Sequence, residues 1–313
     1  MNSWKILLTD GLHSCGQDLL RAAAEVDDRK GITAEALLEV IGLYDGVIIR
    51  NRTHMDKPTI ERAERLKVIG RAGAGVDNID LSAVAAKGVA VVNAPLSTTL
   101  AVAEHTLALM FALARGIPRA DASMKSGQWA KEELQGVELN GKILGIIGMG
   151  RIGSMVASRA AALGMLILGY DPLLPKEEIQ RRNAEPVTLD ELYERAFFIS
   201  LHLPLNPETQ NLIDGQSLGR MQRGVRLICT ARGGIIDETA LLGALESGLV
   251  AGVALDVYTK EPPGMSALVS HPRVVATPHI ASLTIEAQAR AAKDISGEVL
   301  AVLRGEVTHW RVV

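Results

Sequence analysis

The sequence predicts an α/β protein of two domains, each built on a sheet of parallel strands, with one domain inserted into the other. Short apolar runs of strand length alternate with helix-like segments along most of the chain, as in parallel strands joined by helical crossovers. This rhythm restarts at Lys142, and 313 residues are long for one core but suit two. The composition, 48% hydrophobic but only 3% aromatic, favours aliphatic α/β layers.

The first part of the chain predicts one small α/β domain. Its strands are expected at residues 5–8, 46–49, 68–70 and 89–92, and its helices at about 17–24, 34–41, 59–66 and 81–87.

A longer amphipathic helix is expected from about 99 to 114, capped by Thr98 or Thr99 and stopped by Gly116, as the bridge between domains. Six strands follow, at 143–147, 166–170, 198–202, 226–230, 253–257 and 274–277, enough for a doubly wound sheet. A last helix, at about 285–303, is expected to return to the first domain. We therefore predict one domain from residues 1–97 with 285–313, and a second from 98–284.

Charge and cysteine content narrow the class of partner. The formal net charge is −3, without a long basic run, which argues against nucleic acid. Cys15 and Cys229 stand alone, so neither a disulfide framework nor a metal site is expected. The first apolar run is too short for a signal peptide, and Glu104 and His105 interrupt the apolar stretch 100–114. We expect a cytoplasmic protein with a small-molecule partner and no membrane contact.

A glycine-spaced turn follows the expected strand 143–147. Gly148 permits a tight bend, Gly150 lets the backbone approach a pyrophosphate, and Gly153 lets the next helix pack closely on its strand. Such turns also occur in α/β proteins that bind no nucleotide.

Asp171 makes the nucleotide interpretation more specific. It ends the expected strand 166–170 and follows Gly153 by 18 residues, close to the spacing of roughly 20 for the acid that binds the adenosine ribose. A carboxylate there repels a 2′-phosphate, which favours NAD over NADP. The alternative is an ordinary turn residue before Pro172.

Three later segments carry polar groups at expected strand ends, namely 230–237, 254–262 and 277–282. With these segments the chain resembles the D-2-hydroxyacid dehydrogenase family over about residues 44–305. Segments 70–78, 122–129 and 138–142 are closest to the branch that oxidises D-3-phosphoglycerate. The resemblance implies two domains with Rossmann-like and flavodoxin-like sheets, the cofactor domain being a doubly wound parallel sheet inserted into the substrate domain.

The resemblance implies a catalytic role for three residues. His279 would exchange the hydroxyl proton, Glu261 would hold the other ring nitrogen, and Arg232 would bind the substrate carboxylate with its planar fork. The alternatives are a buried structural histidine, a solvated loop acid and a surface turn residue.

The resemblance also implies further contacts to NAD. Arg151 and Ile152 would meet the pyrophosphate, and Leu203 and Pro204 the adenine side. Asp256 would contact the nicotinamide carboxamide. Thr230 and Ala231 would lie near the nicotinamide ribose, and Ala74 and Ser282 complete the set of cofactor-binding residues. Cys229, which replaces a frequent asparagine, is interpreted as an inert buried thiol rather than a redox sensor.

Substrate choice is expected to depend on the first domain. By the same resemblance, the positions of Arg50, Asn51 and Arg71 match those that face the substrate phosphate in the phosphoglycerate-oxidising branch of the family. The amides of Ala74 and Gly75 form a turn suited to a carboxylate. Two guanidiniums at one site favour an anion there. Their alternative role is a salt bridge or a solvated loop.

The implied activity is the NAD-dependent oxidation of D-3-phosphoglycerate to 3-phosphohydroxypyruvate, a step of serine synthesis. The alternatives are a hydroxypyruvate or glyoxylate reductase on the same fold, and an NAD-sensing interaction protein. Residues 120–139, with Trp129, resemble the dimer arm of the family and imply a homodimer. Because the sequence stops at Val313, we expect no serine-binding regulatory domain.

Overall fold

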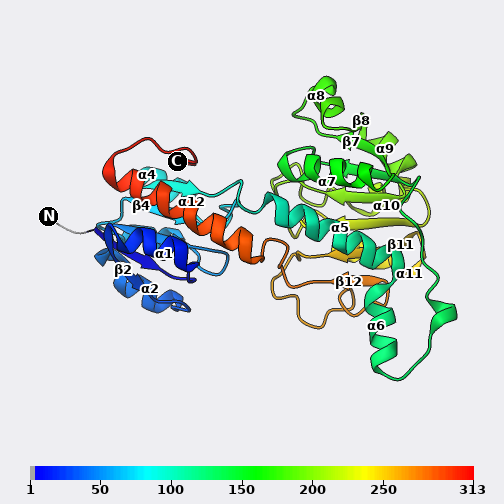
Figure 1. Cartoon of the computed structure of the whole chain (residues 1–313), viewed down its shortest axis with the longest axis horizontal. Coiled ribbons are helices and arrows are strands. Elements are labelled where there is room, and N and C mark those ends of the chain that lie inside the picture. The colour runs from blue at the N-terminus through cyan, green and yellow to red at the C-terminus, as the bar shows by residue number, and fades with distance from the viewer. Residues whose placement is uncertain (1–3) are drawn as a thin grey trace. The chain divides into compact units, whose positions relative to one another are not determined.

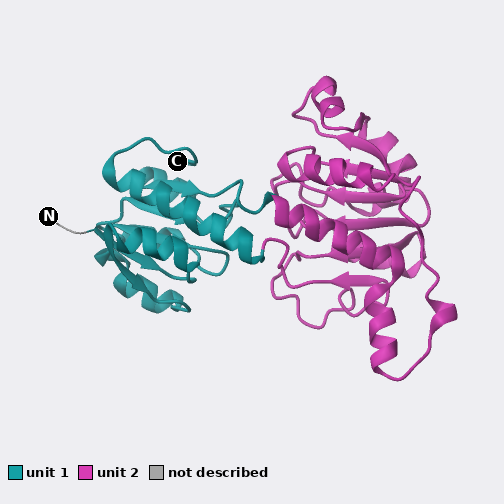
Figure 2. Cartoon of the chain, viewed as in Figure 1, with its two compact units in different colours: residues 1–99, 283–313 teal, residues 100–282 magenta. Residues whose placement is uncertain are grey.

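The computed structural model describes residues 4–313, so the first three residues of the expected domain 1–97 lie outside it. The chain forms two compact units (Figure 2). Unit 1 comprises the chain up to Thr99 together with Leu283–Val313, and unit 2 comprises Leu100–Ser282. Each unit has its own parallel sheet, which confirms the predicted fold class.

The sheet of unit 1 has five parallel strands in the order β2-β1-β3-β4-β5, the flavodoxin-like order. The strands are β1 (Trp4–Leu8), β2 (Ala24–Asp28), β3 (Gly46–Ile49), β4 (Val68–Arg71) and β5 (Ala90–Asn93). The sequence did not predict β2, and the expected helix 17–24 ran into its first residue. The strand Ala24–Asp28 lies at the sheet edge and is only partly buried, so it carries no continuous apolar run.

Most helices of unit 1 begin at side-chain caps. Thr33, Asp56, Asp80 and Thr284 each accept a hydrogen bond from a backbone amide of the first turn. The helices are α1 (Ser14–Arg21), α2 (Ala34–Val40), the 3₁₀ turn η1 (Ile41–Leu43), α3 (Lys57–Arg62), α4 (Leu81–Lys87) and α12 (Ile285–Arg304).

Helix α12 completes the core of unit 1, running beside α1 (Figure 1). A Cβ atom at Gly16 of α1 would lie 2.6 Å from the Ala292 carbonyl oxygen, and one at Gly70 of β4 would lie 2.6 Å from Val299 Cγ2. Only glycine allows such close approach of the helix. Ile295 and Val299 are thereby buried in one cluster with β1 and β3 side chains.

The sheet of unit 2 has seven parallel strands in the order β12-β11-β10-β9-β6-β7-β8. They are β6 (Ile143–Ile147), β7 (Leu166–Tyr170), β8 (Glu185–Pro186), β9 (Phe198–Leu201), β10 (Val225–Cys229), β11 (Val250–Leu255) and β12 (Val274–Ala276). Six were predicted, and β8 was missed because it is only two residues long. The chain leaves β6 toward β7 on one side and returns to β9 on the other. Such a switch point is where open α/β sheets bind ligands.

Helices cover both faces of this sheet. Those of unit 2 are α5 (Thr99–Arg115), α6 (Ile117–Lys125), the 3₁₀ turn η2 (Lys131–Glu133), α7 (Arg151–Ala162), α8 (Lys176–Arg181), α9 (Leu189–Arg195), α10 (Gly215–Arg220) and α11 (Glu238–Glu246). Side chains of α5 and α7 are buried in one cluster, and those of α9, α10 and α11 in another. Within residues 4–313 no single helix is long and apolar enough to cross a membrane, and only the bent pair α5 and α6 passes that test jointly.

Candidate active site

The glycine turn after β6 has the geometry that a dinucleotide requires. Gly148 has φ +93°, and a Cβ there would lie 2.4 Å from the His202 carbonyl oxygen. A Cβ at Gly153 would lie 2.0 Å from the Gly148 carbonyl oxygen, so α7 packs directly on the turn. Around Gly150, by contrast, no protein atom comes within 4 Å of such a Cβ. The turn therefore leaves open space at the start of α7, whose first residues are Arg151 and Ile152, and the N-terminal end of a helix favours a phosphate.

Asp171 follows β7 and reaches back to this turn. Its Oδ2 accepts a hydrogen bond from the Met149 amide at 2.9 Å, and its Oδ1 accepts one from the Leu173 amide at 3.0 Å. Each oxygen retains a lone pair for a ribose hydroxyl. The carboxylate also borders a cleft of about 510 Å³ between α8 and the start of α9. Asp171 thus stabilises the turn, as the alternative of an ordinary turn residue expects. Its carboxylate oxygens can also accept hydrogen bonds from a ligand beside the turn.

The adenine-side residues follow the adjacent strand. Leu203 comes two residues after β9, and its Cδ2 lies 2.9 Å from the position of a Cβ on Gly148. Pro204 is exposed, and its carbonyl oxygen accepts a hydrogen bond from Thr209 Oγ1 at 2.7 Å. The structure brings Leu203 and the glycine turn together.

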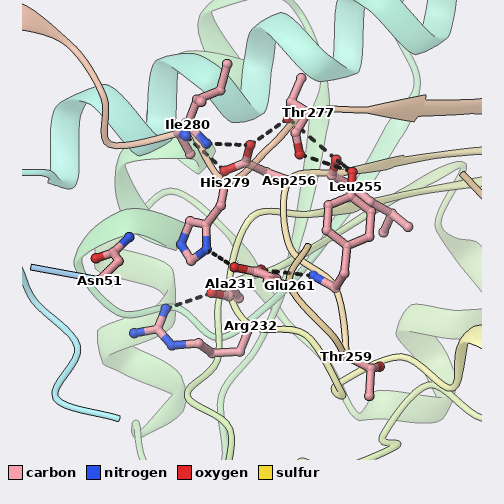
Figure 3. A network of polar contacts seen from close by, with 12 residues as sticks. Asn51, Ala231, Arg232, Leu255, Asp256, Thr259, Glu261, Thr277, His279 and Ile280 are labelled. Carbon is pink, nitrogen blue, oxygen red and sulfur yellow. Dashed lines mark hydrogen bonds and ion pairs between the residues drawn. The ribbon is translucent and has the colours of Figure 1, made fainter. Parts of the chain in front are cut away.

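His279 and Glu261 form a pair. Nδ1 of His279 lies 2.7 Å from Oε2 of Glu261 (Figure 3), and Oε1 of Glu261 accepts a hydrogen bond from the Tyr258 amide at 3.1 Å. Burial raises the pKa of Glu261, but the hydrogen bond and charge of His279 and the Tyr258 amide outweigh it, so the net pKa lies below its usual value. Glu261 is therefore a carboxylate near neutral pH, and it fixes the proton of His279 on Nδ1 when the ring is neutral.

Arg232 lies on the neighbouring loop, after β10. Its Nη1 donates a hydrogen bond to the Ala231 carbonyl oxygen at 2.7 Å. A Cβ at Gly233 would lie 1.8 Å from the Tyr258 carbonyl oxygen, so the loops of Arg232 and Glu261 are in direct backbone contact. Figure 3 shows the Arg232 guanidinium and the His279 ring extending to the same side. Three residues far apart in sequence thus meet at one edge of the sheet.

Asp256 is fully buried, and its carboxylate is already engaged. Oδ1 accepts hydrogen bonds from Thr277 Oγ1 at 2.6 Å and the Ile280 amide at 2.9 Å, and Oδ2 accepts one from the Ala281 amide at 2.9 Å. The contact with a nicotinamide carboxamide stays a prediction.

Sequence reasoning missed two residues on α5. His105 Nε2 lies 3.5 Å from Asp256 Oδ1 and 3.2 Å from Thr277 Oγ1, while Thr106 Oγ1 lies 2.9 Å from Thr230 Oγ1. The available signal was the polar interruption in the apolar stretch 100–114, which we interpreted only as an argument against a membrane span.

The remaining predicted residues of unit 2 flank this edge. Thr230 and Ala231 are buried at the end of β10, and Ser282 follows Ala281. Burial raises the pKa of the Cys229 thiol to about 11, which agrees with an inert thiol.

In unit 1, Arg50 follows β3 and is partly buried. Loss of solvation lowers the pKa of its guanidinium, opposed by the charge of Asp10. Asp10 accepts hydrogen bonds from the Arg50 and Thr53 amides at 2.7 and 3.2 Å and forms an ion pair with Arg52 at 3.1 Å. No carboxylate among residues 4–313 forms an ion pair with the Arg50 guanidinium itself. Asp10 thus holds the loop through backbone amides and Arg52, and Arg50 is a partly buried cation at the start of that loop.

Arg71 and Asn51 belong to the same edge of unit 1. Nη2 of Arg71 donates a hydrogen bond to Asn51 Oδ1, and Nη1 donates one to the Ala72 carbonyl oxygen at 3.1 Å. Beyond them the chain turns through Ala74 and Gly75, where Asn93 Nδ2 donates a hydrogen bond to the Ala74 carbonyl oxygen at 2.7 Å. The Arg71 guanidinium thus already forms hydrogen bonds within unit 1, and its contact with a substrate stays a prediction.

Across residues 4–313, no group of three or more histidine, cysteine or acidic side chains gathers as a metal site.

The chain is similar in sequence and fold to proteins of known family. Residues 107–281 match the family described as D-isomer specific 2-hydroxyacid dehydrogenase, NAD binding domain. The chain is 46% identical over 306 residues to the D-3-phosphoglycerate dehydrogenase of Methanocaldococcus jannaschii, an alignment that covers 97% of this chain and 58% of that protein. The Rattus norvegicus enzyme of the same name is 42% identical over 306 residues, with 97% and 57% covered.

Among solved structures, a glyoxylate reductase from Paecilomyes thermophila has a similar fold, with a TM-score of 0.90 and 33% identity. The match covers 100% of this chain and 99% of that one. The two curated relatives, by contrast, are longer, and this chain spans less than three fifths of their length.

Proposed function

Because the chain belongs to the family of D-isomer-specific 2-hydroxyacid dehydrogenases, we propose that it oxidises D-3-phosphoglycerate to 3-phosphohydroxypyruvate, the entry to serine synthesis. The cofactor of the family is NAD, which supplies the hydride chemistry when bound. The open space at Gly150, the first amides of α7 and the carboxylate of Asp171 fit a dinucleotide with an unmodified ribose. The substrate domain of this proposal is unit 1, and the cofactor domain is unit 2.

The observation that carries the reaction is the pair of His279 and Glu261, 2.7 Å apart. Hydride loss from C2 of a hydroxy acid requires that its hydroxyl lose a proton. A neutral His279, with its proton held on Nδ1, offers Nε2 as the base. The charge of Glu261 then stabilises the imidazolium that forms. In the reverse direction the same Nε2 returns the proton to the keto oxygen.

Arg232 is proposed to orient the substrate. A planar guanidinium binds a carboxylate through two parallel hydrogen bonds, and it also polarises an adjacent C2 oxygen. Holding the reacting carbon in place in this way is worth several powers of ten in rate. The amides of Ala74 and Gly75 are proposed as further donors to the carboxylate.

The phosphate is proposed to lie against Arg50, with Arg71 and Asn51 nearby. A partly buried guanidinium without a paired carboxylate is costly, and a phosphate relieves that cost through charge-assisted hydrogen bonds. The names of the two curated relatives support the same substrate.

Arg50→Ala tests the substrate. Turnover of D-3-phosphoglycerate should fall by about ten- to a hundredfold in kcat/KM, because a charged hydrogen bond of roughly 1.5–3 kcal/mol is lost, while reduction of hydroxypyruvate changes little. Arg62→Ala, at the exposed end of α3, is the charge-matched control. Unchanged turnover of phosphoglycerate with faster reduction of hydroxypyruvate or glyoxylate would assign the chain to the reductases instead.

His279→Asn tests whether the protein is an enzyme. Turnover should be lost while NADH binding, followed by fluorescence, is retained. His271→Asn, in a loop before β12, is the control. If the unmodified protein binds NAD tightly but forms no NADH from any 2-hydroxy acid, the NAD-sensing alternative is correct.

The chain is further proposed to form a cytoplasmic homodimer through α6 and the following loop. Ile117, Met124 and Trp129 are 54%, 58% and 78% exposed in the single chain, and such large apolar side chains suit an interface. Light scattering of Trp129→Ser should give a larger monomer fraction than that of the unmodified protein. A Trp129→Ser protein with an unchanged dimer fraction would remove this loop from the interface.

A further inference from the structure

We propose that His105 of α5 is a positioning residue for this reaction, acting through Thr277 and Asp256 on the segment 277–281 that carries His279. The proposal rests on the proposed role of His279 as the base. All the groups involved belong to unit 2.

The segment 277–281 is held by a single buried carboxylate. Asp256 accepts hydrogen bonds from the Thr277 hydroxyl and the Ile280 amide (Figure 3) and from the Ala281 amide, at 2.6 to 2.9 Å. These three donors lie on both sides of His279. Because Asp256 is fully buried, a departure of any donor would leave a buried charge short of partners, which is costly.

His279 depends on this anchoring because of its backbone. Its φ is +53°, in the left-handed region that few residues other than glycine adopt. Such a conformation persists only where the surrounding structure imposes it. The flanking hydrogen bonds to Asp256 impose it here, and so they set the direction in which the imidazole leaves the chain.

The hydrogen atoms available to these groups assign a donor role to His105. An ionised Asp256 has no hydrogen to give, so the Thr277 hydroxyl hydrogen points to Asp256 Oδ1. The Thr277 oxygen is then free to accept, and the group 3.2 Å away is His105 Nε2. His105 must therefore carry a hydrogen on Nε2. The same atom lies 3.5 Å from Asp256 Oδ1, so it supports the carboxylate directly as well as through Thr277.

The charge state of Asp256 agrees with this arrangement. Burial raises its pKa, but hydrogen bonds from His105, Thr277, Ile280 and Ala281 outweigh burial and bring the net pKa below its usual value.

The packing of α5 against the sheet also fixes the position of His105. The next residue, Thr106, is buried and contacts Thr230 at the end of β10, so this turn of α5 lies against two strand ends. A leucine at position 105 would fit the apolar helix equally well by composition but would donate no hydrogen bond. The distinguishing property of His105 is therefore its ring N–H.

The test compares His105→Leu, which removes the donor, with His105→Gln, which supplies an amide donor in its place. Glu104→Leu, on the exposed face of the same helix, is the matched control. The measurements are kcat and KM with D-3-phosphoglycerate, the Kd of NADH by fluorescence, and amide hydrogen exchange of the peptide that spans residues 277–282.

In His105→Leu, kcat should fall on the order of ten- to a hundredfold, because a small displacement of a catalytic group has an effect of this size. The Kd of NADH should stay within about twofold, exchange of the Ile280 and Ala281 amides should quicken, and His105→Gln should recover most of kcat. The proposal is overturned if kcat of His105→Leu is that of Glu104→Leu, if NADH binding weakens as much as kcat falls, or if His105→Gln is as slow as His105→Leu.

Failure of the proposed function is recognised separately. If the unmodified protein oxidises no 2-hydroxy acid, the exchange measurement alone decides on His105. Faster exchange confined to 277–282 in His105→Leu, and absent in His105→Gln, supports the anchoring, whereas unchanged exchange overturns it.

Discussion

Nδ1 of His279 lies 2.7 Å from Oε2 of Glu261, while the second oxygen of that glutamate accepts the Tyr258 amide at 3.1 Å. The glutamate is therefore fixed at both ends, by the ring on one side and by its own loop on the other. This geometry determines how the pair should respond to pH.

Glu261→Gln should slow hydride transfer on the order of a hundredfold, because the imidazolium loses its counter-charge. The pKa of Glu261 lies below its usual value, so the carboxylate is charged throughout the neutral range. Its removal favours neutral His279, and the rise of kcat/KM with pH in the oxidative direction should shift to lower pH. Glu238→Gln is the control, since Glu238 accepts the Thr259 amide of the same loop at 2.7 Å. A profile that keeps its position would show that Glu261 does not act on the base.

Gly150→Ala and Gly148→Ala should separate binding from folding. A Cβ at Gly150 meets no protein atom within 4 Å, so the melting temperature should be kept while NADH affinity falls by about tenfold or more, because the methyl group occupies the approach to the pyrophosphate. At Gly148, the positive φ and the 2.4 Å contact predict destabilisation by about 1–3 kcal/mol. Equal NADH affinity in Gly150→Ala and the unmodified protein would contradict the assigned pyrophosphate site.

Asp171→Ala should change the choice of cofactor. It removes the acceptor for the Met149 amide, 2.9 Å away, and the proposed acceptor for the ribose. NAD affinity should fall by about ten- to a hundredfold, the effect of one charged hydrogen bond, and NADP should lose less. Asp190→Ala, near the same cleft, is the control. The ratio of kcat/KM for the two cofactors checks the result, and an unaltered ratio counts against the ribose assignment.

Asp256→Asn should flatten the acid dependence of folding stability. The folded-state pKa of Asp256 is below its usual value, since its hydrogen bonds outweigh the effect of burial. Its stabilisation is therefore full above a pH of about 4 and is lost as pH falls through the lowered folded-state pKa. The Asn variant should be less stable at pH 7 by about 1–3 kcal/mol, with less further loss in acid. Urea unfolding from pH 7 to 3 measures this, with exposed Asp18→Asn as the control. An equal slope in both proteins would refute it.

The buried strands were predictable because their apolar runs are continuous. Residues 143–147 and 166–170 were predicted as strands and form β6 and β7 with the same bounds. The edge strand β2 was not predictable in this way, because Asp27 and Asp28 meet solvent and its formation depends on pairing with β1. The sequence of one segment does not show which strand it will pair with.

The residues of the candidate site also differ in whether local sequence was enough to predict them. Gly148, Gly153 and Asp171 follow short-range rules of turn and strand, so their spacing alone was enough to predict a role for them. Arg232, Glu261 and His279 needed the resemblance to the family, because only the sheet order places their loops side by side. The role of His105 depends on a contact with a residue 172 positions away, which no periodicity or spacing in the sequence indicates.

The return of α12 to the first unit has a consequence for the order of folding. Ile295 and Val299 belong to the same buried cluster as Ile6 and Ile48, so β1 and β3 lack part of their core until α12 has been synthesised. Unit 2 is continuous in sequence from Leu100 to Ser282 and can complete its own core earlier. During synthesis we therefore expect the dinucleotide-binding unit to fold before the unit proposed to bind the substrate, whose core is completed only by α12.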